Sequence, residues 1–553
     1  MKALFEEKNK IYTYAWSLVI LLGFGYLVFI GFLRYETNDD FFLSIFTSGF
    51  LGEYNPHTVY SNYVLGILIA LISGFTSAIH LNGSILFYVV EIIIAYFVFT
   101  YRIVKERNAR GIIESLIFIF LSITSIMNKH NYSKTGALVL IVGAYTLATY
   151  KAEESKLIKL IAYILIISGG AYRSDTTIAV LPFVIICFAY GLRDNRDSAI
   201  KKYIIEWCIC FGLILIMWGC HYHAYNANDS WKDFTEFNNL RESLIDYGIP
   251  DWNEHQDEYN AIGWSQNDCQ FLAEWNFADN TTYNNESFKA VNSIGKDTRS
   301  LLSIRRMLHT VKVAVFSIPG MVKYCIGSIW FWIIISESIV CLIKNKSKWI
   351  AIIITDLFIF GELFYLFFAG RTPERAVAIP MLCGIVTLFL FNENRLHIVY
   401  DIVILGIVIV LCGVYKFPSM GKKNMPLKAD MNGFLQELSA QENNLYVWDI
   451  FTFAEAAEKA YAPLDELPYG LFSNSTFLGG WIIPSPVFVE KCDKWGDGNN
   501  LVKLLTENEN VYYISDDYPT EAVLRYIDEH YGLNIQPNLV EEYGRFKVFS
   551  FVE

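Results

Sequence analysis

An adjacent pair of carboxylates opens the stretch of this chain that is best suited to chemistry. Asp39 and Asp40 stand in YETNDDFFLSIFTSGFLGEYNPHTVYSN, residues 35–62, which directly follows the first long apolar run. Charged side chains beside a bilayer cost free energy, so we interpret them first as functional groups. A carboxylate in this position predicts a general base that removes a proton from a hydroxyl group.

Further ionisable residues fall in segments that we place on the same face of the membrane. Cationic side chains hold phosphate oxygens and stabilise the charge that develops on a leaving phosphate. An acid pair facing several cations therefore has the parts needed to transfer a sugar from a lipid phosphate. The candidate catalytic residues are Asp39 and Asp40. The candidate substrate-binding residues are His57, Lys129, His130, Lys134, Arg173, Asp175, Arg371, Glu374 and Arg375.

Each of these residues also has a purely structural interpretation. Asn38 and Asp39 are suited to cap a short helix, and a helix N-terminus lowers the pKa of a carboxyl group near it. Lys129 and Lys134 are equally suited to contact lipid headgroups, and arginines beside an apolar run to reach out of the membrane. The pairs that local ionic contact would join are Arg173 with Asp175, and Glu374 with Arg371 or Arg375.

The composition of the chain indicates a membrane protein. Of its 553 residues, 54% are hydrophobic and 18% are charged. The apolar residues gather in runs of about 17–22, the length that crosses a hydrocarbon core. The net charge of −12 gives no reason to expect a nucleic-acid partner. The ten cysteines are scattered, with neither metal-ligand spacing nor a disulfide framework.

Lysine and arginine set the predicted orientation of the spans. The N-terminus is cytoplasmic, so the first span carries the acid pair to the outer face. We interpret Thr58–Ile79 as a helix lying at the outer surface, because a full span there would reverse every later loop. This gives about eleven spans and an outer C-terminus. The predicted spans are Ile11–Leu33, Ile85–Tyr101, Ile112–Met127, Ala137–Tyr150, Leu157–Ala171, Thr176–Gly191, Tyr203–Cys220, Ile326–Ile343, Trp349–Ala369, Arg375–Phe391 and Ile398–Val414.

The expected fold is thus a polytopic α-helical membrane protein with a small extracytoplasmic α/β domain at its C-terminus. Residues 1–414 form the transmembrane domain, with outer loops at 34–62 and 221–310, and residues 415–553 form the α/β domain. The second loop is polar and rich in Asn, Asp and Trp, and its tryptophans are suited to anchor at the interface or to build a small core. The segments that predict the remaining elements are a surface helix at Val311–Lys323, strands at Leu445–Trp448, Val511–Ile514 and Phe546–Phe551, and helices at Ala454–Tyr461, Asn500–Thr506 and Thr520–His530.

One motif adds a resemblance to these inferences. Its residues are Asp39-Asp40, Gly49, Gly52, Asn55-Pro56, Tyr60 and the run to Gly66. The succession of an early helix, an outer loop with an acidic pair and a surface helix resembles that in the GT-C superfamily of membrane glycosyltransferases. The chain is also similar to an uncharacterised bacterial branch of that superfamily found with surface-polysaccharide pathways. The resemblance covers the whole chain in architecture and this segment alone in motif.

The resemblance implies an activity, a donor and a base. Such enzymes use polyprenyl-phosphate sugars and invert the anomeric centre, and either Asp39 or Asp40 would be the base. Some members bind a divalent metal, but this loop has no Asp-X-Asp motif, so we expect no metal and no other cofactor. The expected partners are the polyprenyl-phosphate sugar, an extracytoplasmic glycan or lipid-linked acceptor, and membrane lipids. The expected location is the cytoplasmic membrane of a bacterium, with the active site outside.

Two other functions stay open from the sequence. An O-antigen-type polysaccharide polymerase or ligase also has many spans and a large outer loop, but such enzymes concentrate Arg and His in later loops than this one. A membrane transporter is the third reading. Against it, the chain shows no inverted repeat and no matched pair of Gly/Pro-broken helices, and its charges gather at one membrane face.

Overall fold

A computed structural model of the chain describes Gly23 and residues 33–37, 39–107, 109–151, 154–194, 200–246, 248–294, 304–391, 404–408, 425–465 and 467–552. The predicted spans Ile11–Leu33 and Ile398–Val414 fall almost entirely outside these residues. So does Asn38, one of the two predicted helix caps.

The membrane part is a helical bundle built around one fully buried helix, α6 (Tyr132–Thr149). Glycines let its neighbours approach closely: a Cβ on Gly169 would lie 2.5 Å from the backbone nitrogen of Leu140. Helices α4, α7, α8 and α17 pack against α6. The other helices of the bundle and their bounds are α4 (Gly83–Arg107), α5 (Ala109–Ile126), α7 (Lys156–Tyr172), α8 (Ser174–Asp194), α9 (Ile200–Asn226), α15 (Ile329–Lys344), α16 (Trp349–Phe368) and α17 (Glu374–Phe389).

Among the described residues, four helices are long and apolar enough to cross a membrane. These lie at Gly83–Arg107, Ser174–Arg193, Ile200–Asn226 and Trp349–Phe368, and a bent helix pair makes a fifth candidate. Each coincides with a predicted span, so the chain is an integral membrane protein. The total of about eleven spans stays a prediction.

Two segments that we expected to lie along the membrane surface form helices of their own. The first is α3 (Tyr63–Thr76), which continues as a short 3-10 turn at Ser77–Ile79. Its 14 residues make about 21 Å of helix, short of a hydrocarbon core of about 30 Å. The second is α14 (Ile304–Gly327), which meets α15 at a bend of 83°. The predicted break between a surface helix and a span therefore exists in the structure.

The C-terminal part forms a mixed five-stranded sheet in the order β2-β1-β3-β5-β4. The three strands β2, β1 and β3 run parallel, and β5 and β4 add an antiparallel edge. The predicted α/β character is confirmed. The elements are α19 (Met425–Ala440), β1 (Leu445–Trp448), α20 (Ile450–Ala460), β2 (Ser475–Phe477), α21 (Pro486–Cys492), α22 (Leu501–Glu507), β3 (Val511–Ser515), α23 (Glu521–Tyr531), β4 (Asn538–Tyr543) and β5 (Phe546–Ser550). Among these, β2, β4, α19 and α21 were not predicted.

The segment predicted as a long polar loop after α9 is largely helical. It contains α10 (Asp229–Ile245), a 3-10 turn (Trp252–Glu254), α11 (Gln256–Ala261), α12 (Gln266–Ala273) and α13 (Asn285–Val291), which we call the helical insert. The insert packs on the C-terminal sheet domain: Phe271 stacks on Tyr526 with ring centroids 4.3 Å apart. Buried Asp279 accepts hydrogen bonds from Tyr526 and Tyr531 at 2.9 and 2.6 Å. Trp264 is 2% exposed, which makes it a core residue.

A charged hydrogen bond joins the same two parts and predicts a pH dependence. His530 Nε2 lies 2.7 Å from buried Asp268. Burial lowers the pKa of His530, but the bond to Asp268 outweighs it and the pKa lies above its ordinary value. The stabilisation is therefore complete below the unfolded-state pKa of about 6.5 and is lost as pH rises through the higher folded-state value. We expect His530→Gln to lower the free energy of local opening of α12 by about 1 kcal/mol at low pH and to change it little at high pH. The measurement is amide hydrogen exchange of α12 at both ends of the pH range. Equal losses at both ends of the pH range would contradict this assignment.

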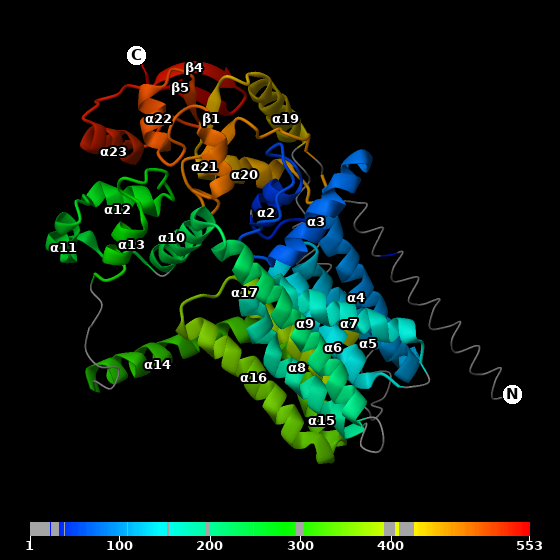
Figure 1. Cartoon of the computed structure of the whole chain (residues 1–553). Helices are drawn as coiled ribbons and strands as arrows, with labels where there is room; N and C mark the ends of the chain where they lie inside the picture. The colour runs from blue at the N-terminus through cyan, green and yellow to red at the C-terminus, as the bar shows by residue number, and fades with distance from the viewer. Residues whose placement is uncertain are drawn as a thin grey trace.

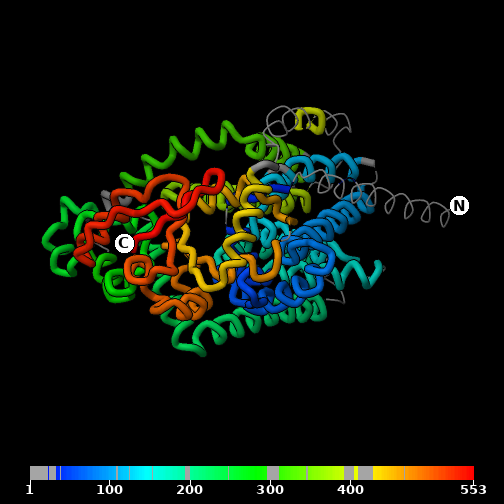
Figure 2. Tube along the Cα trace, turned by 90° about the horizontal axis from the view of Figure 1, so that it is seen from above, coloured from blue at the N-terminus to red at the C-terminus, as the bar shows by residue number. Residues whose placement is uncertain are grey.

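Helix α2 (Asp39–Thr47) lies between the bundle and the C-terminal sheet domain (Figure 1). Viewed from above, the C-terminal chain covers this part of the bundle (Figure 2). Phe41 stacks on Tyr461 at 5.8 Å, and Phe42 contacts Phe477 at 5.5 Å. The helix that carries the acid pair is therefore held from both sides.

Candidate functional site

The acid pair occupies the first turn of α2, where carboxylates are favoured by the helix dipole. Every residue from Asp40 to Thr47 is buried. The aromatic side chains of this turn enter the C-terminal sheet domain, while Ser44 Oγ lies 2.7 Å from Ser84 Oγ of α4. Because the two residues of the pair are consecutive, they point in different directions from the helix axis. Asp40 points into the protein, and Asp39 stays partly exposed.

The chain before α2 is paired with the turn between α5 and α6. His130 N–H donates to the carbonyl of Arg34 at 2.6 Å, and Glu36 N–H donates to the carbonyl of His130 at 2.9 Å. These backbone bonds fix α2 against the N-terminus of α6. The predicted outer loop 34–62 thus meets the connection between the predicted spans Ile112–Met127 and Ala137–Tyr150, as a shared site requires.

Asp40 is fully buried and bonded to the start of α6. Its Oδ1 accepts a hydrogen bond from the Tyr132 N–H at 2.9 Å, and its Oδ2 accepts one from Asn131 Nδ2 at 3.4 Å. Burial, with the neighbouring charge of Asp39, raises the pKa of Asp40 well above its ordinary range. His130 is also fully buried, with Nδ1 3.6 Å from Asp40, and burial lowers its pKa to about 3. The environment thus favours neutral forms of both side chains.

Asp39 faces a guanidinium instead. The Arg375 Nη2 atom lies 3.5 Å from Asp39 Oδ2, and the two side chains are 25% and 20% exposed. The backbone N–H of Arg375 donates to Glu36 Oε1 at 2.8 Å, which holds the start of α17 beside α2. Of the two acids, Asp39 is the one that a substrate hydroxyl can reach.

Lys134 connects the acids on either side of α6. Its Nζ lies 2.7 Å from Glu36 and 3.2 Å from Glu374, and its side chain is 1% exposed. Glu374 also accepts a hydrogen bond from Ser125 Oγ at 2.8 Å and faces the more exposed Lys129 at 3.7 Å. We predicted Lys134 in an outer loop, but it lies in the first turn of α6, where its ammonium is fully paired.

Arg173 reaches the same region from the connection between α7 and α8. Its Nη1 donates to Tyr132 Oη at 3.0 Å, and its guanidinium lies 5.5 Å from the centre of the Tyr60 ring. It also forms the predicted local pair with Asp175, at 3.3 Å, although Asp175 itself is 75% exposed. Arg173 and Arg375 therefore place two guanidinium groups near the acid pair.

Two predicted substrate ligands make their contacts elsewhere. His57 stacks on Trp231 with ring centroids 4.0 Å apart, and burial lowers its pKa to about 4. None of its contacts within the described part of the chain reaches the acid pair. Arg371 pairs with Glu242 at 3.3 Å and with Asp246 at 2.8 Å, both near the end of α10. Arg371 thus ties the bundle to the helical insert.

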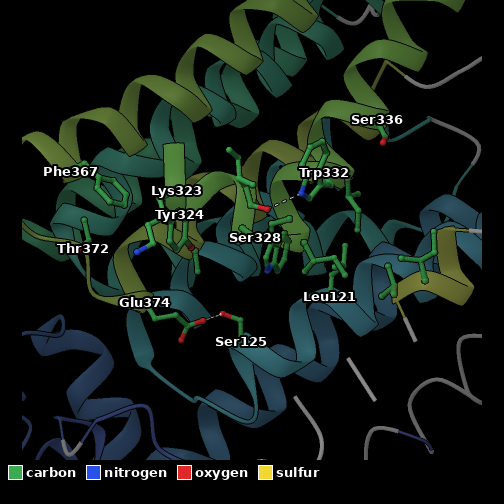
Figure 3. Close-up of a pocket in the computed structure, with 18 of the residues that line it drawn as sticks. Leu121, Ser125, Lys323, Tyr324, Ser328, Trp332, Ser336, Phe367, Thr372 and Glu374 are labelled. Atoms are coloured by element: carbon green, nitrogen blue, oxygen red, sulfur yellow. Dashed lines mark hydrogen bonds between the residues drawn. The ribbon is translucent and has the colours of Figure 1, made fainter. Parts of the chain in front are cut away.

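A large cavity adjoins this ionic network. Its volume is about 1030 Å³, and its walls come from α5, α14, α15, α16, α17 and residues 404–408. Most of the lining is apolar or aromatic, and its charged groups are Glu374 and Lys323, with hydroxyl groups from Ser125, Ser328, Ser336 and Thr372 (Figure 3). Because Glu374 belongs both to the cavity wall and to the Lys134 pair, the cavity ends at the ionic network.

One group of three potential metal ligands occurs among the residues that the structure describes. It consists of Asp268, Glu529 and His530, whose ligand atoms lie within 4.8 Å of one another. Ser265 already bonds both carboxylates, through its N–H to Asp268 and its Oγ to Glu529. The group belongs to the contact of the insert with α23, so we assign it a structural role.

Several residues of the site were missed by the sequence analysis. Glu36 stands three residues before Asp39, and Tyr132 stands in the same segment as His130 and Lys134. Both are close in sequence to residues that we selected, and that proximity was the available signal. Lys323 and Ser125 lie in apolar helices, where the pattern of the chain gives no hint of a shared cavity.

No family model and no curated protein matches the chain. Among solved structures, it is similar to the crystal structure of ArnT from Cupriavidus metallidurans bound to undecaprenyl phosphate. The likeness covers 96% of this chain and 97% of that chain, at 9% sequence identity and a TM-score of 0.40. A score this low does not establish a common fold, so it carries no argument about activity.

Proposed function

We propose that the protein is an inverting glycosyltransferase that moves a sugar from a polyprenyl phosphate to an extracytoplasmic glycan or lipid-linked acceptor. The observation that carries the proposal is the junction of three features. A partly exposed carboxylate, Asp39, faces a guanidinium, Arg375. The residue just before Arg375, Glu374, lines a large apolar cavity. A lipid-linked anion needs an apolar space and a cationic end, and a hydroxyl nucleophile needs a base beside it.

In the proposed reaction, an acceptor hydroxyl attacks the anomeric carbon from the face opposite the phosphate. The new C–O bond forms as the bond to the phosphate oxygen breaks, and the phosphate leaves with the bonding electron pair. The hydroxyl proton passes to the carboxylate of Asp39. A single displacement of this kind inverts the anomeric centre.

The two arginines stabilise the departing phosphate. A guanidinium offers five N–H donors, and among the described residues one side-chain nitrogen of Arg375 faces Asp39. The remaining donors are the groups that hold phosphate oxygens. Arg173 is oriented by Tyr132 and Tyr60, which fixes its plane before the substrate arrives. Lys129, which is 47% exposed, adds charge at the edge of the site.

Asp40 has a supporting part in this proposal. Burial raises the pKa of Asp40 and favours its protonated form, and a carboxyl group that already holds a proton cannot serve as the base. Its bond to the Tyr132 N–H instead keeps α2 against α6. Asp40 therefore positions Asp39, and Asp39 acts as the base.

The lipid chain of the donor is proposed to occupy the large cavity, which gives a prediction. Gly327 lines the cavity, and a Cβ built on it meets no atom within 4 Å. Gly327→Trp is expected to raise KM about tenfold for a long-chain donor, because it excludes roughly two CH₂ groups from apolar contact. A donor with a truncated lipid should be affected less. The matched control is Gly361→Trp on α16, where a Cβ also meets nothing within 4 Å and no cavity wall is involved.

Removal of divalent metal gives a second check. The carboxylates beside the site are balanced by Lys134 and Arg375, so no metal is needed to hold them together. We expect EDTA to leave the transfer rate unchanged and added Mg²⁺ or Mn²⁺ to have no effect beyond that of ionic strength. A rate that is abolished by EDTA and restored by one of these ions would contradict the proposed mechanism.

The class of reaction is tested with purified protein and a panel of polyprenyl-phosphate sugars. Transfer of one sugar per event, with inversion at its anomeric carbon, supports the proposal. Joining of preassembled chains from a lipid pyrophosphate would indicate a polymerase or ligase. Solute uptake by proteoliposomes without transfer would indicate a transporter.

A further inference from the structure

A second cavity lies away from the acid pair, between the helical insert and the C-terminal sheet domain. Its volume is about 510 Å³. One wall comes from α10 and the approach to α13, and the other comes from α21 and the residues on either side of it. The two walls are far apart in the sequence, so the cavity exists only when the insert and the sheet domain are packed together.

Side-chain amides dominate the polar part of this cavity. Asn280, Asn284, Asn285 and Asn499 line it. The amide of Asn284 caps α13 and donates to backbone carbonyls, and Asn285 Nδ2 donates to the carbonyl of Asp233. The amides of Asn280 and Asn499 offer both donors and acceptors, which match the hydroxyl groups of a saccharide. The Oδ1 atom of Asn285 is buried and accepts no hydrogen bond from the described residues. The floor of the cavity includes Phe234, Phe237 and Tyr283, all at most 5% exposed, which gives the cavity a rigid apolar base.

Carboxylates give the cavity its charge. Asp233, Glu490 and Asp493 line it, and none of the described lining residues is a lysine or arginine. All three acids are exposed. An anionic sugar would be repelled from such a site, whereas an ammonium group would be attracted.

We propose that this cavity binds a saccharide that carries a free amino group. The hydroxyl groups bond to the amides of Asn280 and Asn499, and the ammonium lies between Asp233 and Glu490. Among the described residues, Asp493 Oδ1 also accepts the Gly498 N–H at 3.0 Å, so Asp493 helps to hold the wall. The ligand is thus a glucosamine-type unit of a glycan, distinct from the lipid-linked donor.

The walls of this cavity continue to the catalytic region. Phe488 of α21 contacts Phe46 of α2 with ring centroids 6.0 Å apart. On α10, one turn beyond Phe237, Arg241 donates to Tyr60 Oη at 3.1 Å, and Tyr60 in turn packs on Arg173. A glycan bound in the cavity therefore contacts α10 and α21, the two helices that pack against Tyr60 and against α2. Its role as the acceptor rests on the proposed glycosyltransferase function, whereas its binding does not.

Binding is measured with the full-length protein in detergent, without a donor, so that no turnover is required. The probes are the trimers of glucosamine, N-acetylglucosamine and galacturonic acid, titrated by calorimetry. We expect the glucosamine trimer to bind most tightly and the galacturonic acid trimer not to bind. The double variant D233N/E490Q should weaken binding of the glucosamine trimer at least about tenfold, the loss expected for one charge-assisted contact. It should change binding of the N-acetylated trimer much less.

Two further variants complete the test. The matched control D257N/E509Q removes two exposed acids outside the cavity and should leave every affinity unchanged. Ser230→Trp places a bulky side chain at an exposed lining position and should abolish binding of all three sugars, with an unchanged melting temperature as the check on folding. Tightest binding of the galacturonic acid trimer, or no binding of any trimer, would overturn the inference. Binding that survives both D233N/E490Q and S230W would also overturn it.

The outcome for this cavity is separable from the outcome for the reaction. Asp39→Asn should bind the glucosamine trimer as tightly as the unaltered protein does, because Asp39 is not part of the cavity. Absence of transfer with every donor would contradict the proposed function and leave the binding result intact. Transfer with no measurable saccharide binding would support the proposed function and contradict the inference about this cavity.

Discussion

Asp39→Asn is expected to lower kcat by about 10²–10⁴-fold, the usual contribution of a general base. The substitution keeps the size of the side chain and removes only its capacity to accept a proton. Asp39 is partly exposed and makes one ion pair, with Arg375 at 3.5 Å, so its loss should cost less than about 1 kcal/mol of stability. The measurement is single-turnover transfer from a polyprenyl-phosphate sugar at saturating acceptor, beside the melting temperature of each protein.

Asp40→Asn is the matched control, because it makes the same chemical change one residue along the chain. The amide oxygen can still accept the Tyr132 N–H that now bonds to Asp40. Burial already disfavours the charged form of Asp40, so the neutral amide is a close replacement for it. We expect transfer within about tenfold of the unaltered rate. Full activity in Asp39→Asn with loss in Asp40→Asn would move the base to Asp40.

Lys134→Met is expected to destabilise the protein by about 3–5 kcal/mol, the usual result of removing one partner from a buried ion pair. Methionine fills most of the same space, but it leaves Glu36 and Glu374 without the ammonium that lies 2.7 and 3.2 Å from them. The side chain of Glu36 is only 7% exposed, so water cannot replace the lost partner. The change is measured as the free energy of unfolding in detergent.

Lys129→Met provides the comparison, because Lys129 faces the same carboxylate of Glu374. Its ammonium lies farther away, at 3.7 Å, and its side chain is 47% exposed. An exposed pair of this kind contributes less than about 1 kcal/mol. Similar losses in the two variants would show that Lys134 is not the group that neutralises these acids.

The helices of the bundle could be predicted from the sequence because each one is encoded by its own residues. Runs of apolar residues with cationic ends predicted α4, α8, α9 and α16. Charge placement alone predicted that Thr58–Ile79 lies at the membrane surface; the segment contains the 14-residue helix α3, and its position at the surface stays a prediction. The parallel strands β1 and β3 were visible as short apolar runs. The edge strand β4 was missed because its side chains are mostly exposed and polar.

The two acids could be selected from the sequence but not distinguished. Their difference arises from contacts with residues about 90 to 340 positions away, Tyr132 for Asp40 and Arg375 for Asp39. Neither composition nor spacing contains that information. The same reason explains His57, whose polar type suggested a ligand but whose ring packs against Trp231 in a distant helix. It also explains the helical insert, whose core is completed by residues of the C-terminal sheet domain, as Phe271 shows by its stacking on Tyr526.

The position of α2 has a consequence for how the protein is made. The helix is synthesised long before Phe453, Phe477 and Phe488, against which its aromatic side chains pack. Chains grow from the N-terminus, so a nascent chain has its acid pair long before it has the surface that fixes it. The site is thus assembled only after the C-terminal sheet domain has been synthesised and has folded against α2. A prematurely terminated chain would carry all the reactive groups and be unable to use them.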